Sequence, residues 1–250
     1  MDAMSEQYYP ISPYVYALNN PIFFVDPDGN YIEIYYGNDS KQHQRYSYNK
    51  DRDYSEIEKT SAFLADAYRA LDAIYKSSEI EVEGEKINIM DGLISSSREL
   101  SVAHTEKGSA FAPARDFKSS GKWKDGVSSV IGTIHFNNKE GVLFDDVNDS
   151  DVKTLELQLF NNKFAKTAQV NSPTSMLGHA FEWNRNPNAY NNRKRDITDR
   201  KNTPYFRNAE EKNATTLSTQ INIKLKENPR YNYMGAGVIT EGVLSNKIKR

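Results

Sequence analysis

The sequence predicts an α+β fold, because segments with strand periodicity and segments with helical periodicity occupy different parts of the chain. Tyr31–Tyr36 alternates apolar and polar residues, and 127–136 is the most regular strand pattern of the second half. The apolar residues that follow Ser55, Ser172 and Asn208 recur instead at helical intervals. We therefore expect a mixed helix and strand domain, and no repeats appear in the sequence.

The composition excludes several kinds of site and partner. Its 250 residues suffice for one substantial domain or two small ones, and its formal net charge of −2 provides no overall basic field for nucleic acid. Cys is absent, which excludes disulfides and thiolate metal sites. The first residues have neither the basic nor the apolar region of a signal peptide, and no apolar run reaches membrane-spanning length. The compartment is left undetermined.

Residues 1–30 differ from the rest, being aromatic, punctuated by Pro and poor in charge. They contain Tyr8-Tyr9-Pro10-Ile11-Ser12-Pro13-Tyr14-Val15-Tyr16, then Asn19-Asn20-Pro21, then the turn sequence Asp26-Pro27-Asp28-Gly29. An ordinary strand, turn and strand accounts for the local pattern. The whole string resembles the end of the Rhs-repeat-associated core of bacterial Rhs/YD-repeat proteins. That resemblance implies a segment that closes a β cage, with a variable toxin tip after it.

The segments that follow give local predictions. We expect a strand over 31–36, a linker or exposed hairpin over 37–53, and an amphipathic helix that opens at Ser55 with Glu58 three residues later. A short hairpin is predicted around Gly84, and 91–104 is predicted to continue as strand after a turn. The acidic residues of 145–151 lack the Gly and Glu positions of an EF-hand, so a solvated loop is expected there. Residues 155–168 fit a strand or a helix.

Two predicted helices carry the chemistry-bearing residues. Ser172 and Pro173 are suited to the N-cap and first position of a helix that contains His179 and Glu182. A second helix is predicted from Asn208, which has capping-box spacing to Glu211. One helix thus carries His179, and the next carries Glu210 and Glu211.

These two helices resemble those of a zinc metallopeptidase-like class of Rhs toxin tips. Pro173-Thr174-Ser175-x-Leu177-Gly178-His179 matches the start of that family's Pro-Thr-Ser-x-Leu-Gly-His-Glu-x-x-His-Ala helix, and Asn208-Ala209-Glu210-Glu211-Lys212 matches its second helix. Gly132–Phe136 resembles the strand that precedes the metal helix, which can line the cleft and pair with an extended substrate. The resemblance implies a zincin-like tip domain and zinc as its cofactor.

The zinc motif itself is broken. The family has His-Glu-x-x-His-Ala where this chain has His179-Ala180, so the general base and one of the two His ligands are missing. Read without a gap, Ala180 takes the place of the base and Trp183 that of the second ligand. His179, Glu210 and Glu211 are predicted as vestigial metal ligands, and Glu182 as a weak catalytic candidate. The alternatives are a packed histidine for His179 and a helix-capping role for Glu211.

The predicted function is a degenerate metallopeptidase-like tip of an Rhs-type polymorphic toxin, inactive as a peptidase. The alternatives are a weakly metal-dependent hydrolase that uses His179, Glu182 and Glu210 or Glu211, a non-enzymatic binding module, and a nuclease tip. The nuclease alternative would use the basic stretch 193–201 with His135 or His104. A basic stretch of this kind is more often a solvated loop. Nucleic acid is therefore not the expected partner.

The predicted organisation follows from the same resemblance. Residues 1–30 are predicted as the end of the Rhs core, 31–53 as a strand and linker, and 54–250 as the tip domain. The implied partners are the parent Rhs cage and a cognate immunity protein. The implied route is delivery as part of a larger Rhs protein.

Overall fold

The computed structural model describes residues 32–37, 44–50, 55, 57–117, 123–125, 129–143, 168–169, 174–198, 206–227, 236–245 and 249. The Rhs-like residues 1–30, the cap residues Ser172 and Pro173, the acidic stretch 145–151 and nearly all of 155–168 lie outside this part of the chain.

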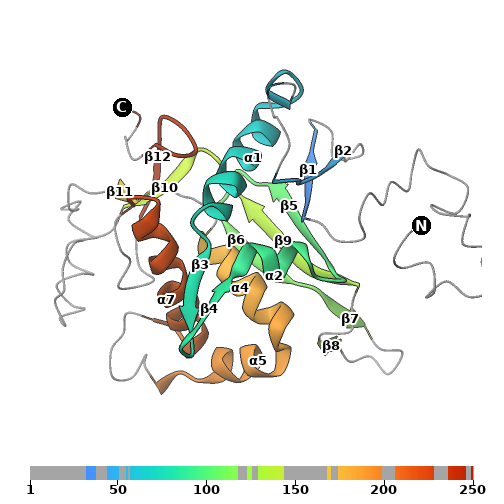
Figure 1. The fold of residues 1–250 in the computed structure, drawn as a ribbon, viewed down its shortest axis with the longest axis vertical. Coiled ribbons are helices and arrows are strands. Elements are labelled where there is room, and N and C mark those ends of the chain that lie inside the picture. Colours follow the sequence, from blue (N-terminus) through green and yellow to red (C-terminus); the bar gives the residue numbers. More distant parts are fainter. Residues whose placement is uncertain are drawn as a thin grey trace, which may run out of the picture.

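The centre of the fold is a five-stranded sheet with the order β2-β1-β5-β9-β6 (Figure 1). Its strands are β1 (Ile32–Tyr36), β2 (Gln44–Ser47), β5 (Glu99–His104), β6 (Ala110–Pro113) and β9 (Val130–Phe136). β1, β5 and β9 run parallel, while β2 and β6 run antiparallel at the two edges. Together with the helices, this mixed sheet confirms the predicted α+β class.

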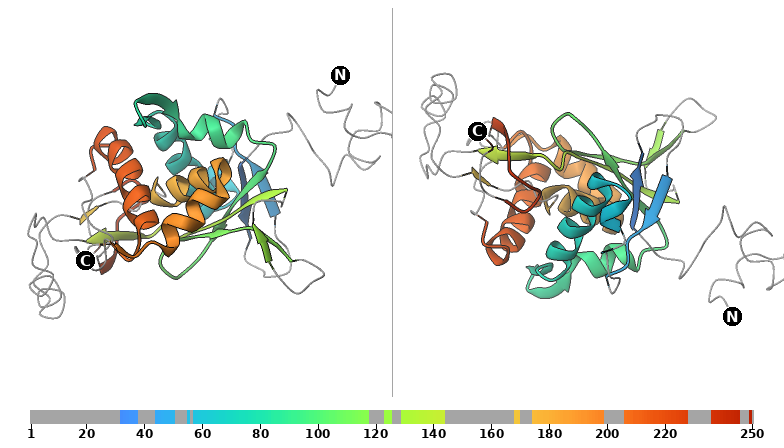
Figure 2. Two further views of the ribbon diagram at one scale, coloured as in Figure 1. Left: turned by 90° about the horizontal axis from the view of Figure 1, so that it is seen from below. Right: turned by 90° about the horizontal axis from the view of Figure 1, so that it is seen from above.

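The two faces of this sheet differ in character because side chains alternate along each strand. Ile34, Val102 and Ile134 are partners in adjacent strands and are all buried. The next row consists of Glu33, Ser101 and Thr133, and is polar. Figure 2 shows the helices gathered on one side of the sheet, so one apolar face is covered and forms the core.

The first long helix, α1 (Ala62–Tyr75), begins later than the sequence suggested. Ser61, not Ser55, is its N-cap, and the Ser61 hydroxyl accepts from the Leu64 N–H at 3.4 Å. Ile57 lies in a short 3-10 turn, η3 (Ile57–Lys59), ahead of the helix. The predicted apolar stripe is confirmed, since Leu64, Leu71 and Ile74 are buried together with Ile57.

The region around Gly84 forms the predicted hairpin of β3 (Glu79–Val82) and β4 (Glu85–Asn88). Glu83 and Gly84 both have positive φ, at 54° and 84°, as a two-residue turn matched to the strand twist requires. The prediction for 91–104 was wrong in its first part. Asn88 accepts from the N–H groups of Met90 and Asp91, both at 3.0 Å, and so starts the short helix α2 (Ile89–Ile94) before β5.

The helix predicted to carry His179 is α4 (Thr174–Arg185), and α7 (Ala209–Lys224) follows from Asn208 as predicted. The first part of the segment between them is helical. Asn186 accepts from the Ala189 N–H at 2.9 Å and Pro187 occupies the first turn, so α5 (Pro187–Arg195) forms there. This helix includes the beginning of the basic stretch that was expected to be a solvated loop.

Smaller strand pairs complete the described structure. β7 (Arg115–Phe117) pairs with β8 (Trp123–Asp125), and β10 (Glu140–Leu143) lies between β11 (Ala168–Gln169) and β12 (Ala236–Ile239). Within the described residues, no helix combines the length and apolar character that crossing a bilayer requires.

Strand β9 forms where predicted but has a different role. It is hydrogen-bonded to β5 on one side and to β6 on the other, so its backbone is not open to an extended substrate. The outermost strand beside it is β6. Gly132 permits this pairing, because a Cβ there would lie 2.4 Å from the Ala112 carbonyl oxygen, and its φ of +154° lies in the region that favours glycine.

The segment 37–53, predicted as a linker or exposed hairpin, is in part a component of the core. β2 and β1 do form a hairpin, but β1 also pairs with β5. Tyr48 is buried against Tyr68, with ring centroids 4.9 Å apart, and its hydroxyl donates to Asp72 at 2.9 Å. The burial of Tyr48 could not be predicted from its neighbours, because Ser47, Asn49 and Lys50 are polar.

This arrangement predicts that a chain starting at Tyr54 will not fold. It would lose Ile32 and Ile34, which are fully buried, and expose their partners in β5. Each buried Ile contributes about 2–5 kcal/mol, against a total stability of about 5–15 kcal/mol. Urea unfolding followed by circular dichroism should show a cooperative transition for residues 31–250 and none for 54–250. A cooperative transition in the shorter chain would contradict the placement of β1 and β2.

Candidate functional site

The candidate site lies where α4 crosses α7. The two helices are in contact at Gly178, where a Cβ would lie at an ordinary contact distance of 3.5 Å from the Ala214 carbonyl oxygen. His179 is 7% exposed and Glu210 is 1% exposed. The His179 Nδ1 atom lies 3.2 Å from the Glu210 Oε1 atom. Of the two adjacent carboxylates at the start of α7, Glu210 is thus the one that faces the imidazole.

Glu211 is the other member of that pair and does not take part. Its Oε2 atom accepts from the Arg207 N–H at 2.8 Å, while the Asn208 side chain accepts from the Glu211 N–H at 3.0 Å. These bonds satisfy free donors at the start of α7. Glu211 therefore has the capping role and is not brought to His179 as a ligand.

Arg193 completes the site, although it belongs to the basic stretch 193–201 that was expected to be a solvated loop. The Arg193 Nε atom donates to Glu210 Oε2 at 2.6 Å, and the Arg193 Nη2 atom donates to Glu182 Oε2 at 2.6 Å. Glu182 is 5% exposed. One guanidinium from α5 thus joins a carboxylate from α4 to a carboxylate from α7. We refer to His179, Glu182, Arg193 and Glu210 as the ion cluster.

The position of Arg193 on a helix could have been predicted from the residues that precede it. Asn186-Pro187 is a helix-start signal, and a helix from there places Tyr190 and Arg193 one turn apart on the same face. Tyr190 is buried, with its ring centroid 6.1 Å from His179 and 5.2 Å from Trp183. These rings form an apolar wall beside the ion cluster, which lowers the local dielectric and strengthens its charge interactions.

The pKa of Glu182 is raised above its ordinary value. Burial of the carboxylate is the largest cause, and the nearby Glu210 carboxylate acts in the same direction. The Arg193 guanidinium opposes both but does not cancel them. Glu182 therefore holds its proton more firmly in the folded chain than in the unfolded chain.

The donor set does not suit a catalytic zinc ion. Among the described residues, no group of three or more His, Asp or Glu side chains is arranged to hold a metal. One oxygen of Glu210 faces His179, and the other accepts from Arg193, so an entering cation would have to displace the guanidinium. Glu182, the catalytic candidate, accepts from the same guanidinium through its Oε2 atom.

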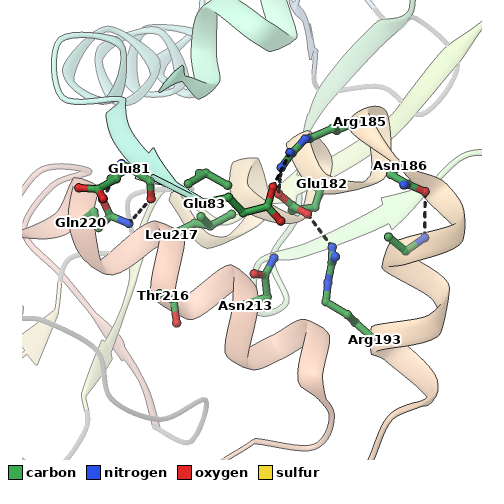
Figure 3. Close-up of a pocket in the computed structure, with 12 residues that line it drawn as sticks. Glu81, Glu83, Glu182, Arg185, Asn186, Arg193, Asn213, Thr216, Leu217 and Gln220 are labelled. Atoms are coloured by element: carbon green, nitrogen blue, oxygen red, sulfur yellow. Dashed lines mark hydrogen bonds and ion pairs between the residues drawn. The ribbon is translucent and has the colours of Figure 1, made fainter. Parts of the chain in front are cut away.

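A cavity of about 540 Å³ opens beside the ion cluster, between α4, α5, α7 and the hairpin of β3 and β4 (Figure 3). Glu182 and Arg193 form part of its wall. On the hairpin side, the Gln220 amide pairs with the backbone of Glu81 in both directions, at 2.9 and 3.0 Å. Arg185 spans the opening, at 3.0 Å from Glu83 and 3.9 Å from Glu182.

The histidines of the nuclease alternative do not join this site. Ala103 pairs with His135 and His104 pairs with Phe136, so His104 and His135 lie on opposite faces of the sheet. His104 stacks edge-on against Phe63, 5.0 Å between centroids. Arg193, the first residue of the basic stretch 193–201, is bound to two carboxylates, and positions 199–201 lie outside the described residues.

Comparison of the chain with protein-family models, with curated proteins and with solved structures finds no match in any of the three.

Replacing Arg193 by Met should destabilise the protein severely, because two buried carboxylates would lose their shared counter-charge. The expected loss is about 3–5 kcal/mol at pH 7, measured by urea unfolding. The loss should shrink toward pH 4.5 as Glu182, whose pKa is raised by burial, becomes protonated. Arg195→Met, an exposed change in the last turn of the same helix, is the matched control and should cost less than about 0.5 kcal/mol. Equal losses in the two variants would contradict the ion cluster.

Glu182→Gln should change the pH dependence of stability in a defined direction. Because the folded-state pKa of Glu182 is raised, its contribution is fully present below the unfolded value of about 4.5. This contribution is lost as the pH rises through the folded-state value. Wild type should therefore lose stability relative to Glu182→Gln as the pH is raised from 4 to 8. A relative gain of wild type over this range would show that Arg193 outweighs burial.

Proposed function

We propose that this chain is the end of an Rhs-type polymorphic toxin, with a metallopeptidase-like tip that has lost its zinc-peptidase centre. The observation that carries the proposal is the bonding of one guanidinium, from Arg193, to both Glu182 and Glu210. The cation that holds these carboxylates is thus an amino-acid side chain. Support for the lineage comes from the matching sequence strings and from the contact between His179 and Glu210.

The positions that a working motif would need are filled by packing residues. In α4 the residue after His179 is Ala180, and the residue four positions on is Trp183; both are fully buried. A general base and a second imidazole would have to occupy these two positions. Trp183 packs instead against Tyr190, which stabilises the junction of α4 and α5. The helix has kept its place in the fold and lost the reactive groups.

The arrangement around α4 is compatible with an ancestral peptidase cleft. α4 packs against β9 and against the edge strand β6, so an exposed strand backbone lies beside the helix that carries His179. An edge strand can hydrogen-bond an extended peptide. In this proposal β6, rather than β9, corresponds to the strand that lines the cleft.

The partners follow from the proposed role. A tip of this kind would be delivered as part of a larger Rhs protein, whose cage ends with residues 1–30, and would be neutralised by a cognate immunity protein. A full-length Rhs reading frame upstream of this chain and a small immunity gene downstream would support this part of the proposal. Neither partner bears on the chemistry of the ion cluster.

Metal content tests the loss of the zinc centre. Structural and catalytic zinc sites use at least three protein ligands. Purified protein should therefore contain far less than one zinc per chain, measured by plasma mass spectrometry after dialysis against zinc. Stoichiometric zinc that disappears in His179→Ala would overturn the proposal.

The same measurement tests the lineage when the motif is rebuilt. Inserting Glu-Phe-Gly-His after His179 restores His-Glu-x-x-His and turns the following residues by only roughly 40°, since four residues correspond to about 1.1 helical turns. Combined with Arg193→Gln to release Glu210, the insertion should bind about one zinc per chain. Glu210→Gln should then lower the binding, and Glu211→Gln should not. A folded insertion variant with no additional zinc would exclude a metallopeptidase ancestry.

A further inference from the structure

The polar face of the central sheet buries a carboxylate beside an edge strand. Glu33 of β1 is only 2% exposed. Its Oε1 atom accepts from the Ser47 hydroxyl of β2 at 2.6 Å, while its Oε2 atom is covered and has no hydrogen-bond partner in the described structure. A buried carboxylate oxygen without a donor is unfavourable, above all when the carboxylate is charged. Ionisation of Glu33 therefore costs free energy for as long as the group stays buried.

The charged and titratable groups around Glu33 come from three strands. Arg45 on β2 favours the ionised carboxylate, and Glu99 on β5 opposes it. Glu99 has donors of its own, because the hydroxyls of Tyr35 on β1 and Ser101 on β5 both donate to its Oε1 atom, at 3.0 and 2.9 Å. Burial is the largest influence on Glu33, and it raises the pKa of this carboxyl above the ordinary value. A proton on Glu33 thus stabilises the closed sheet.

Strand β2 is the element that can move away from the carboxylate at the smallest cost. It lies at the edge of the sheet and pairs with β1. Its C-terminal end is anchored, because the Tyr48 N–H donates to the Ile32 carbonyl at 2.8 Å and the Tyr48 side chain is buried. Within Gln44–Ser47 the side chains are exposed or half-buried, and Tyr46 packs against the core. Opening from the free end would bring water to Glu33 and break few contacts.

We propose that β2 is a pH-sensitive edge strand, closed on β1 when Glu33 carries a proton and opening about Tyr48 when Glu33 is ionised. Opening transfers the carboxylate to water, where its pKa returns to the ordinary value of about 4.5. The extra stability of the closed form is fully present below that value, and it is lost as the pH rises through the raised, closed-form pKa. An open β2 leaves one side of the β1 backbone without its ladder partner.

Hydrogen exchange of the isotope-labelled full chain, followed by NMR from pH 5 to pH 8, tests the switch. The opening constant of an amide is its exchange rate divided by the rate of the same amide in an unstructured chain, which removes the intrinsic effect of pH. Tyr46 is the reporter, since antiparallel pairing alternates and its N–H faces Ile34 as that of Tyr48 faces Ile32. Its opening constant should rise roughly fivefold or more over this range. Val102, in the interior strand β5, should stay far better protected than Tyr46 at every pH.

Three variants assign the effect to Glu33. Glu33→Gln keeps the shape and an acceptor for Ser47 but cannot ionise, so the opening constant of Tyr46 should lose most of its pH dependence. Ser47→Ala removes the donor that favours the ionised carboxylate, and should increase opening more at pH 8 than at pH 5. Glu85→Gln changes an exposed acid of the β3–β4 hairpin and should leave the pH dependence as it is in wild type.

Four results would each overturn the proposal. The first is equal protection of Tyr46 and Val102 at pH 8, which would show that β2 opens only with the whole chain. The second is an opening constant at Tyr46 that does not change with pH. The others are an unchanged pH dependence in Glu33→Gln and a Ser47→Ala effect that is larger at pH 5 than at pH 8.

Discussion

The arrangement of the C-terminal half depends on the pairing of Arg193 with Glu182 and Glu210. Two carboxylates on different helices are buried, and burial of an unpaired charge is strongly unfavourable. One planar guanidinium binds both, each at 2.6 Å, and so fixes the position of α5 against α4 and α7. The orientation of His179, the wall of Tyr190 and Trp183, and one side of the cavity all follow from this bond pair.

The sharing of Arg193 has an electrostatic consequence. Glu182 and Glu210 bind the same guanidinium, and a guanidinium carries the counter-charge of only one carboxylate. The pKa of Glu182 is raised mainly by burial of its carboxylate, and the Glu210 carboxylate adds to the shift.

The central sheet supports α4, the helix that carries His179, on the side away from α7. α4 packs on β9 and β6, and their close pairing depends on Gly132, where a side chain would collide with the Ala112 backbone. α2 also packs against α4, at Gly92, where a Cβ would lie 2.9 Å from the Phe181 ring. Both contacts join residues distant in the sequence. The His179 helix is therefore held by glycine-dependent contacts that its own sequence does not reveal.

The sequence alone was enough to predict the features that depend on interactions between residues close together in the chain. Apolar spacing and capping residues identified α4, α7, β9 and the hairpin at Gly84, and the α+β class followed from them. It also placed His179 and Glu210 on helices that could meet. The tertiary structure decided what depends on contacts between distant residues: that Glu210 rather than Glu211 faces His179, that Tyr48 is buried, and that β9 is interior. Arg193 shows the reason most clearly, since a basic residue in a polar stretch looks solvated until the fold brings two buried carboxylates to it.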